Sequence, residues 1–229
     1  MGARTGAQDG ARPGVRTFTP RWRTSPLTAE RMANLLPARD VGHGVFDAEA
    51  VCGRRAPLVV EIGSGHGAAA IAYAAAHPDQ DLVAVEVHVP GVARMLAAAQ
   101  AAGVANLWVH RGDALPWIAN SLAEGTVTAF HLFFPDPWPK KKHAKRRFIQ
   151  QHTLDLLAAR LVPGGAVLIA TDIEVYGEHV REHLERHGGW SVTLGERPSW
   201  RPTDGFEAKG TLAGRTAYEI TAVRSGPLR

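Results

Sequence analysis

The sequence is poor in cysteine and contains no long apolar run. Its 229 residues include one cysteine, Cys52, which excludes an internal disulfide and suits a reducing compartment. No segment approaches the roughly 18 consecutive apolar residues of a membrane-spanning helix. Residues 1–16 are polar and Arg-rich, without the apolar core of a signal peptide. We therefore expect a cytoplasmic protein that does not enter a membrane.

Positive charge is concentrated in one short segment. The net charge of +4 is modest, yet six lysines and arginines occupy the eight positions 140–147. Such a cluster favours binding to a polyanion such as nucleic acid, because several phosphates are neutralised together and counterions are released. The alternative interpretation is a charged loop that is merely solvated.

From residue 58 onward, short Val- and Leu-rich runs alternate with Ala-rich segments of helical length. This alternation is typical of parallel strands joined by crossover helices, so we expect one α/β domain with a seven-stranded sheet. Strands are expected at 58–63, 82–87, 107–112, 127–134, 165–171, 190–196 and 216–224. Helices are expected at 68–76, 91–102, 116–123, 147–161 and 174–187.

The remaining segments predict the domain organisation. Residues 1–20 lack the apolar side chains that would offset the entropy of ordering, so we expect a flexible tail. A helical extension is expected at 21–57, followed by the main domain at 58–229. Residues 197–215 are rich in Gly and Pro and predict a long loop between the last two strands.

A glycine-rich turn follows the first expected strand and precedes an Ala-rich helix. The turn holds Gly63 and Gly65, and Glu61 lies at its entrance. This context predicts a nucleotide-binding site, although a tight turn without a ligand is the alternative. A carboxylate would repel the pyrophosphate of NAD but would attract the ammonium and sulfonium groups of S-adenosylmethionine. We therefore expect S-adenosylmethionine here.

Two further acids end the next two expected strands. Glu86 follows Gly65 by 21 positions, close to the offset of roughly 20 at which an acid accepts hydrogen bonds from ribose hydroxyls. Asp113 ends the third strand, where it can accept from the adenine amino group, although it can equally be a helix cap. Both acids are expected at the carboxyl edge of the sheet, beside the glycine turn.

The fourth expected strand runs into Phe134-Pro135-Asp136-Pro137-Trp138, directly before the cationic cluster. Prolines on both sides of Asp136 stiffen the backbone, so its carboxylate is held in one geometry. This arrangement is suited to orienting a substrate. A proline-rich surface turn is the alternative, but it leaves the aromatic residue and the gathered cations unexplained.

The segment 134–147 resembles the hallmark of the bacterial tRNA (guanine-N7-)-methyltransferase family, F-P-D-P-W-x-K-x-x-H-x-K-R-R, at every fixed position. The resemblance extends over residues 16–224. It implies a Rossmann-like class I methyltransferase fold, with a mostly parallel seven-stranded sheet, an antiparallel last strand and helices on both faces. It also implies S-adenosylmethionine as methyl donor, S-adenosylhomocysteine as product and no metal.

The same resemblance implies roles for individual residues. The cofactor-contacting acids would be Glu61, Glu86, Asp113 and Asp136, of which Asp136 would also be the active-site residue. The implied substrate and RNA contacts are Lys140, Lys142, His143, Lys145, Arg146, Arg147, Asp172, Asp204, Phe206 and Glu207. One departure stands out, because this chain has Asp204-Gly205 where the family usually has Thr-Lys.

The implied reaction methylates N7 of a guanine in tRNA, at position 46 of the variable loop, and forms 7-methylguanosine. The N7 lone pair carries no proton, so a general base is not required, and Asp136 would accept hydrogen bonds from the purine. Three alternatives stay open: an exocyclic-amine methyltransferase, an RNA-binding protein of the same fold without turnover, and a nicotinamide dehydrogenase. We expect no membrane contact, no obligate protein partner, and a monomer or a homodimer.

Three histidines recur at helical spacing, at His179, His183 and His187. This spacing invites a metal-site interpretation, but no further ligand pattern accompanies it. A solvated helix face is the expected explanation.

Overall fold

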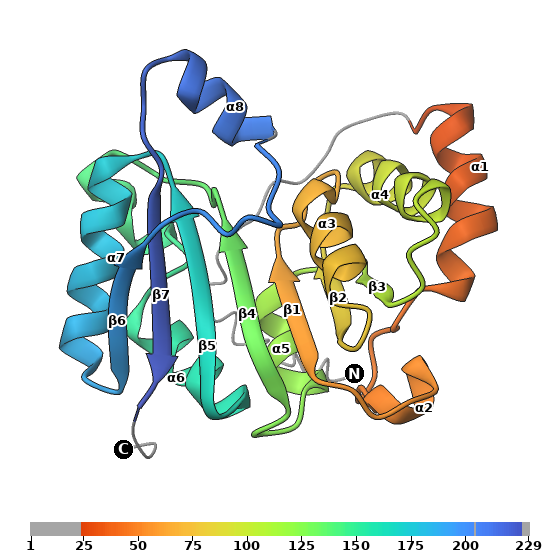
Figure 1. Ribbon diagram of the computed structural model, residues 1–229, viewed down its shortest axis with the longest axis horizontal. Helices are drawn as coiled ribbons and strands as arrows, with labels where there is room; N and C mark the ends of the chain where they lie inside the picture. The colour runs from red at the N-terminus through yellow and green to blue at the C-terminus, as the bar shows by residue number, and fades with distance from the viewer. Residues whose placement is uncertain (1–23, 204, 226–229) are drawn as a thin grey trace, which may run out of the picture.

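The computed structural model describes residues 24–203 and 205–225. Seven strands form one sheet in the order β3-β2-β1-β4-β5-β7-β6 (Figure 1). Among the described strands, only β7 runs antiparallel to its neighbours. The pairs β3–β2, β2–β1, β1–β4 and β4–β5 are parallel. The strands are β1 (Leu58–Ile62), β2 (Asp81–Val85), β3 (Leu107–His110), β4 (Val127–Phe133), β5 (Leu161–Thr171), β6 (Trp190–Gly195) and β7 (Tyr218–Arg224). The predicted sheet, including the antiparallel last strand, is confirmed.

Helices cover both faces of the sheet because its central strands are apolar on both sides. On one face, Val59 packs with Tyr73 and Met95 of α3 (Ala68–Ala76) and α4 (Val89–Ala101). On the other face, Val60 belongs to the core that includes Leu154. The helices of this second face are α5 (Ala114–Ser121), α6 (Gln151–Arg160) and α7 (Glu174–His187). Alternate residues of β1 therefore enter two separate cores, as expected for a sheet with two buried faces.

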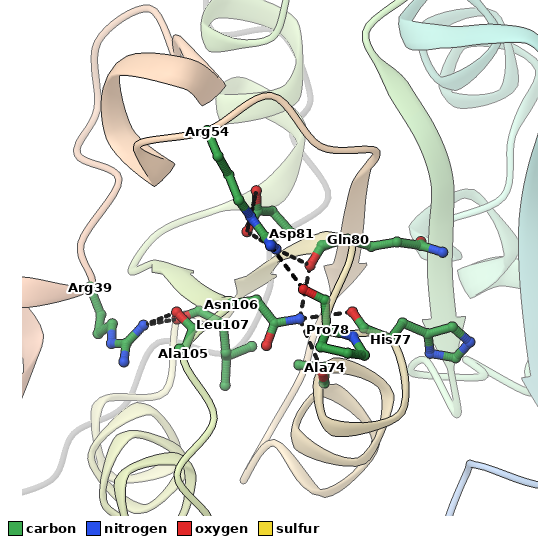
Figure 2. A network of polar contacts seen from close by, with 10 residues as sticks. All are labelled: Arg39, Arg54, Ala74, His77, Pro78, Gln80, Asp81, Ala105, Asn106 and Leu107. Carbon is green, nitrogen blue, oxygen red and sulfur yellow. Dashed lines mark hydrogen bonds and ion pairs between the residues drawn. The ribbon is translucent and has the colours of Figure 1, made fainter.

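The segment before β1 contains α1 (Pro26–Leu35), the short 3-10 helix η1 (Leu36–Ala38) and α2 (Ala48–Cys52). Two arginines attach this segment to the amino ends of β2 and β3 (Figure 2). Arg54 donates to the Asp81 carboxylate at 3.0 Å and to the Gln80 carbonyl at 2.9 Å. Arg39 donates to the Val104 carbonyl at 3.2 Å. Asp40 also forms a parallel bridge to Val109, so the extension is fixed along β3 at the edge of the sheet. The expected tail at 1–20 lies outside the described residues, and the domain division stays a prediction.

The expected loop at 197–215 is wrong in its central part, because α8 (Gly205–Leu212) occupies it. An isolated helix of eight residues is marginal, so its stability comes from tertiary contacts that the local sequence does not reveal. Glu207 in its first turn pairs with the buried Arg201 at 3.3 Å. Gly210 lies so close to Asp172 that a β-carbon would meet the carboxylate at 2.3 Å. Figure 1 shows α8 at the edge of the sheet where β1 and β4 end.

The expected solvated face of α7 is also wrong. His179 is 8% exposed, and its Nε2 lies 2.7 Å from the Ile149 carbonyl oxygen. Burial lowers the pKa of His179, and burial together with the neighbouring His179 lowers the pKa of His183 to about 4. The three histidines contact α6 or the residue before its N-cap, through Ile149, Gln151 and Asp155. Within the part of the chain that the structure describes, no helix is long and apolar enough to cross a membrane.

Candidate active site

The glycine turn after β1 is built around a carboxylate. Gly63 and Gly65 have φ values of 74° and 58°, in the left-handed region that glycine adopts without strain. Oε2 of Glu86 accepts from the Gly65 N–H at 2.7 Å, and Oε1 accepts from the His88 N–H at 2.7 Å. A β-carbon on Gly63 or Gly65 would meet nothing within 4 Å. The turn is therefore held by Glu86 and borders open space.

Two adjoining cavities surround this turn and form one crevice. The larger, of about 470 Å³, includes Glu61 and Arg201 in its lining. The smaller, of about 240 Å³, includes Asp113 and Asp136. Both cavities are lined by Gly63, Gly65, Glu86, Phe133 and Phe134. The crevice thus brings together the four acids whose cofactor contacts were predicted, at the carboxyl ends of β1 to β4.

The acids differ in how they are held. Glu61 is buried on β1, and its Oε2 has no hydrogen-bond partner among the described residues. Asp113 caps α5, because its Oδ1 accepts from the Leu115 N–H at 3.1 Å. The cap and the cofactor contact were alternatives for Asp113, yet a carboxylate has a second oxygen, and Asp113 also lines the cavity. The described geometry therefore allows both roles.

The turn that carries Asp136 has a strained backbone, which hydrogen bonds from a buried arginine hold in place. Phe134 and Trp138 have φ values of 49° and 39°, which non-glycine residues adopt at a cost of about 1–3 kcal/mol each. Arg147 is 4% exposed and donates from Nε to the Pro137 carbonyl at 3.0 Å and from Nη2 to the Trp138 carbonyl at 3.2 Å. The Asp136 side chain is exposed on this fixed backbone. Such strain persists only where the surroundings over-determine the conformation, as at functional sites.

The position of Arg147 corrects its predicted role. We expected it to contact RNA, but its buried guanidinium already donates to backbone carbonyls, so it stabilises the turn instead. Arg146 lies over the Trp138 ring at 4.8 Å and lines the smaller cavity. The exposed cations of this segment are Lys140, Lys141, Lys142, Lys145 and Arg146, while His143 is half-buried.

A second buried arginine, which sequence reasoning did not single out, stands on the other side of the crevice. Arg201 is 2% exposed and pairs with Glu219 at 2.9 Å and with Glu207 at 3.3 Å. Its guanidinium also lies 4.7 Å from the centre of the Phe133 ring. Nothing in the local sequence distinguishes Arg201 from an exposed arginine, because its partners come from β7 and α8.

The remaining predicted substrate contacts lie around α8. Glu207 is buried in the ion pair with Arg201 and lines the larger cavity. Asp172 follows β5 and accepts from Nε of Arg215 at 2.8 Å. Asp204 and the side chain of Phe206 lie outside the described residues. Neither Asp172 nor Lys140 is among the residues that line the two cavities.

The strand order, the single antiparallel strand and the acids at successive strand ends define a class I S-adenosylmethionine-dependent methyltransferase fold. Solved structures share it: a 16S rRNA methyltransferase, KamB, has a TM-score of 0.58 at 18% identity and covers 82% of this chain and 99% of its own. A SAM-dependent O-methyltransferase from Thermotoga maritima has a TM-score of 0.53 at 17% identity, covering 90% and 73%. At these identities the likeness concerns the fold alone.

Sequence relatives narrow the class to a family. Residues 55–220 match a family model described as "Putative methyltransferase". The tRNA (guanine-N(7)-)-methyltransferase of Chromohalobacter salexigens is 42% identical over 191 residues, 80% of this chain and 78% of that one. The enzyme of the same name from Halorhodospira halophila is 43% identical, covering 77% and 79%. The chain belongs to the tRNA (guanine-N7-)-methyltransferase family, and the resemblance drawn from the hallmark is confirmed.

Proposed function

We propose that this chain transfers the methyl group of S-adenosylmethionine to N7 of a guanine in tRNA and releases S-adenosylhomocysteine. The observation that carries the proposal is the placement of Asp136 on a rigid turn in the same crevice as the glycine turn and Glu86. Exposed cations follow directly in the chain. Membership in the family supports the choice of tRNA and of N7, and we assign the guanine to position 46 of the variable loop.

The residues of the crevice fit the proposed cofactor. When bound, S-adenosylmethionine supplies a methyl group activated by its positively charged sulfur. Glu61 lines the larger cavity, so its carboxylate is available to the ammonium group. Glu86 accepts two backbone N–H groups and keeps lone pairs for ribose hydroxyls. The free oxygen of Asp113 would accept from the adenine amino group.

The acceptor side works by positioning. Guanine N7 carries a lone pair and no proton, so the chain needs no general base for this reaction. We assign Asp136 to accept hydrogen bonds from guanine N1–H and the exocyclic amine, which orients N7 and offsets the positive charge that develops on the purine. Orientation of this kind is worth up to about 7–11 kcal/mol in well-ordered systems. The brace from Arg147 keeps the Asp136 backbone in place.

The cations after Trp138 would hold the RNA backbone. Lys140, Lys142, Lys145 and Arg146 are exposed next to the turn, where they can neutralise phosphates and set the register of the substrate. His143 and Asp172 are assigned to the same substrate surface. We place the activity in the cytoplasm, in accord with the lone Cys52. We propose a monomer or a homodimer that needs no other protein.

The test is to incubate purified protein with unmodified tRNA and methyl-labelled S-adenosylmethionine, and then to identify the labelled nucleoside by mass spectrometry. We expect 7-methylguanosine, formed once per tRNA. Label on an exocyclic amine would replace this proposal by the first alternative. RNA binding without any incorporated label would favour the protein without turnover.

A further inference from the structure

Two buried polar side chains lie next to each other on one face of the sheet, on neighbouring strands. Glu61 of β1 and His131 of β4 are direct partners in the parallel ladder, so their side chains lie on the same face. Their side chains are 4% and 1% exposed, and Glu61 Oε2 lies 3.7 Å from His131 Nδ1. Both atoms lack hydrogen-bond partners among the described residues. Unpaired buried polar atoms are costly and call for an explanation.

The ring of His131 is fixed by its aromatic neighbours. Trp200 stacks on it at 5.4 Å with an interplanar angle of 20°, and Tyr73 meets it edge-on at 4.8 Å. The centre of the Phe133 ring lies 5.1 Å from the centre of the imidazole, on a third side. The imidazole therefore cannot swing away from Glu61 to find another partner. Glu61, by contrast, also lines the larger cavity, so this residue lies between the ring and the crevice.

We propose that His131 is a positioning residue for the methyl donor. With a proton on Nδ1, it donates to the Glu61 carboxylate from the neighbouring strand. This hydrogen bond directs the carboxylate toward the ammonium of the methionine part of S-adenosylmethionine. An approach of about 1 Å brings Nδ1 and Oε2 within hydrogen-bond distance. The inference rests on the proposed function for the identity of the ligand. His131 would act on the cofactor through Glu61, without touching the cofactor itself.

The experiment compares two ligands, S-adenosylhomocysteine and 5′-methylthioadenosine, by isothermal titration calorimetry in the absence of RNA. The second ligand keeps the adenosine and the sulfur but lacks the amino acid that Glu61 would hold. The variants are His131→Leu, which removes the N–H donor, and His131→Gln, which keeps one. His179→Leu is the matched control, because His179 is a buried histidine that packs between α7 and α6, outside both cavities.

We expect His131→Leu to weaken S-adenosylhomocysteine binding by about tenfold, the effect of losing a hydrogen bond to a charged group. Binding of 5′-methylthioadenosine should change by less than about twofold in the same variant. His131→Gln should recover most of the lost affinity, and His179→Leu should leave both affinities unchanged.

Equal losses for both ligands, or no recovery by glutamine, would overturn the proposal and leave His131 as a packing residue. The proposed function fails in a different way. A wild-type protein that binds S-adenosylhomocysteine and depends on His131, yet methylates no tRNA, would refute the function and leave the positioning role standing. A wild-type protein that binds neither ligand would refute both.

Discussion

The crevice has a methyl-donor side, formed by the glycine turn, and a methyl-acceptor side, formed by the Asp136 turn. The two turns are held by side chains of opposite charge. On the donor side, the Glu86 carboxylate accepts from the backbone N–H groups of Gly65 and His88. On the acceptor side, the buried guanidinium of Arg147 donates to the carbonyls of Pro137 and Trp138. The donor turn uses glycines at positive φ, whereas the acceptor turn places Phe134 and Trp138 there. A glycine turn is unstrained, so one carboxylate that accepts its N–H groups is enough to hold it. A strained turn of bulky residues needs a rigid side chain that donates several hydrogen bonds.

The two buried arginines, Arg147 and Arg201, differ in the groups that accept their hydrogen bonds. Arg147 donates to neutral carbonyls, while Arg201 lies between the carboxylates of Glu207 and Glu219. Removal of Arg147 therefore leaves unpaired dipoles, and removal of Arg201 leaves unpaired buried charges. The comparison predicts that stability depends most on Arg201, turnover on Asp136, and donor affinity on Glu86.

The largest effect is expected from Arg201→Met. This change leaves Glu207 and Glu219 without their buried cation, which typically costs about 3–5 kcal/mol. Urea denaturation monitored by circular dichroism measures the loss. Arg55→Met is the matched control, because Arg55 makes an exposed ion pair worth less than about 1 kcal/mol. Equal stabilities for the two variants would show that the buried ion pairs of Arg201 do not stabilise the fold.

Asp136→Ala is expected to lower the rate of methyl transfer by at least about a hundredfold, as when one preorganised polar contact to a developing charge is lost. Binding of S-adenosylhomocysteine should stay within a few fold, since the glycine turn and Glu86 are untouched. Single-turnover kinetics and calorimetry separate the two effects. Asp155→Ala on α6, outside both cavities, is the control. Near-normal turnover in Asp136→Ala would remove the residue from the acceptor site.

Glu86→Gln should act on the donor side alone. The amide has one oxygen, so it cannot accept from both Gly65 and His88, and the turn loses a charge-assisted hydrogen bond. We expect about tenfold weaker binding of S-adenosylhomocysteine, with an unchanged KM for tRNA. A rise in the KM for tRNA of similar size would mean that the cofactor side and the RNA side of the crevice are coupled.

The smallest effect concerns stability in acid, through His183 on α7. The pKa of His183 is lowered to about 4 in the folded protein, mainly by burial, against an ordinary value of about 6.5 in the unfolded chain. Between these values the unfolded state binds more protons, so stability falls as the pH drops from about 6.5 to about 4. Because His183 is partly solvent-screened, we expect less than about 1 kcal/mol from it. Denaturation at pH 7 and pH 5 should show a smaller loss in His183→Gln than in the wild type.

Much of the fold follows from local patterns in the chain. The helices at Ala68–Ala76 and Glu174–His187 begin and end where the sequence predicts. The first follows the glycine turn, with Gly67 as its N-cap, and the second ends at the C-cap glycine Gly188. The helix expected at 147–161 begins instead at Gln151, where Thr153 Oγ1 accepts from the Gln150 N–H at 2.9 Å. Residues 147–150 look helical in sequence, but Arg147 is held by the Asp136 turn.

The candidate site was predictable where it depends on strand ends and not where it depends on distant partners. Glu61, Glu86 and Asp113 could be grouped because parallel strands end at one edge of the sheet. His131 could have been suspected, since it interrupts an apolar strand beside the one that carries Glu61. Arg201 could not, because no pattern in one sequence tells a buried arginine from a solvated one.

The sequence alone determined the family, the alternation of strands and helices, and the acids that meet at the sheet edge, because these depend on side-chain periodicity and on a long local hallmark. The tertiary structure decided which cations face solvent, that Arg147 and Arg201 are internal braces, and that Glu61 faces His131. Burial and pairing depend on residues far apart in the chain, so only the folded arrangement decides whether a charge binds a ligand or supports the protein.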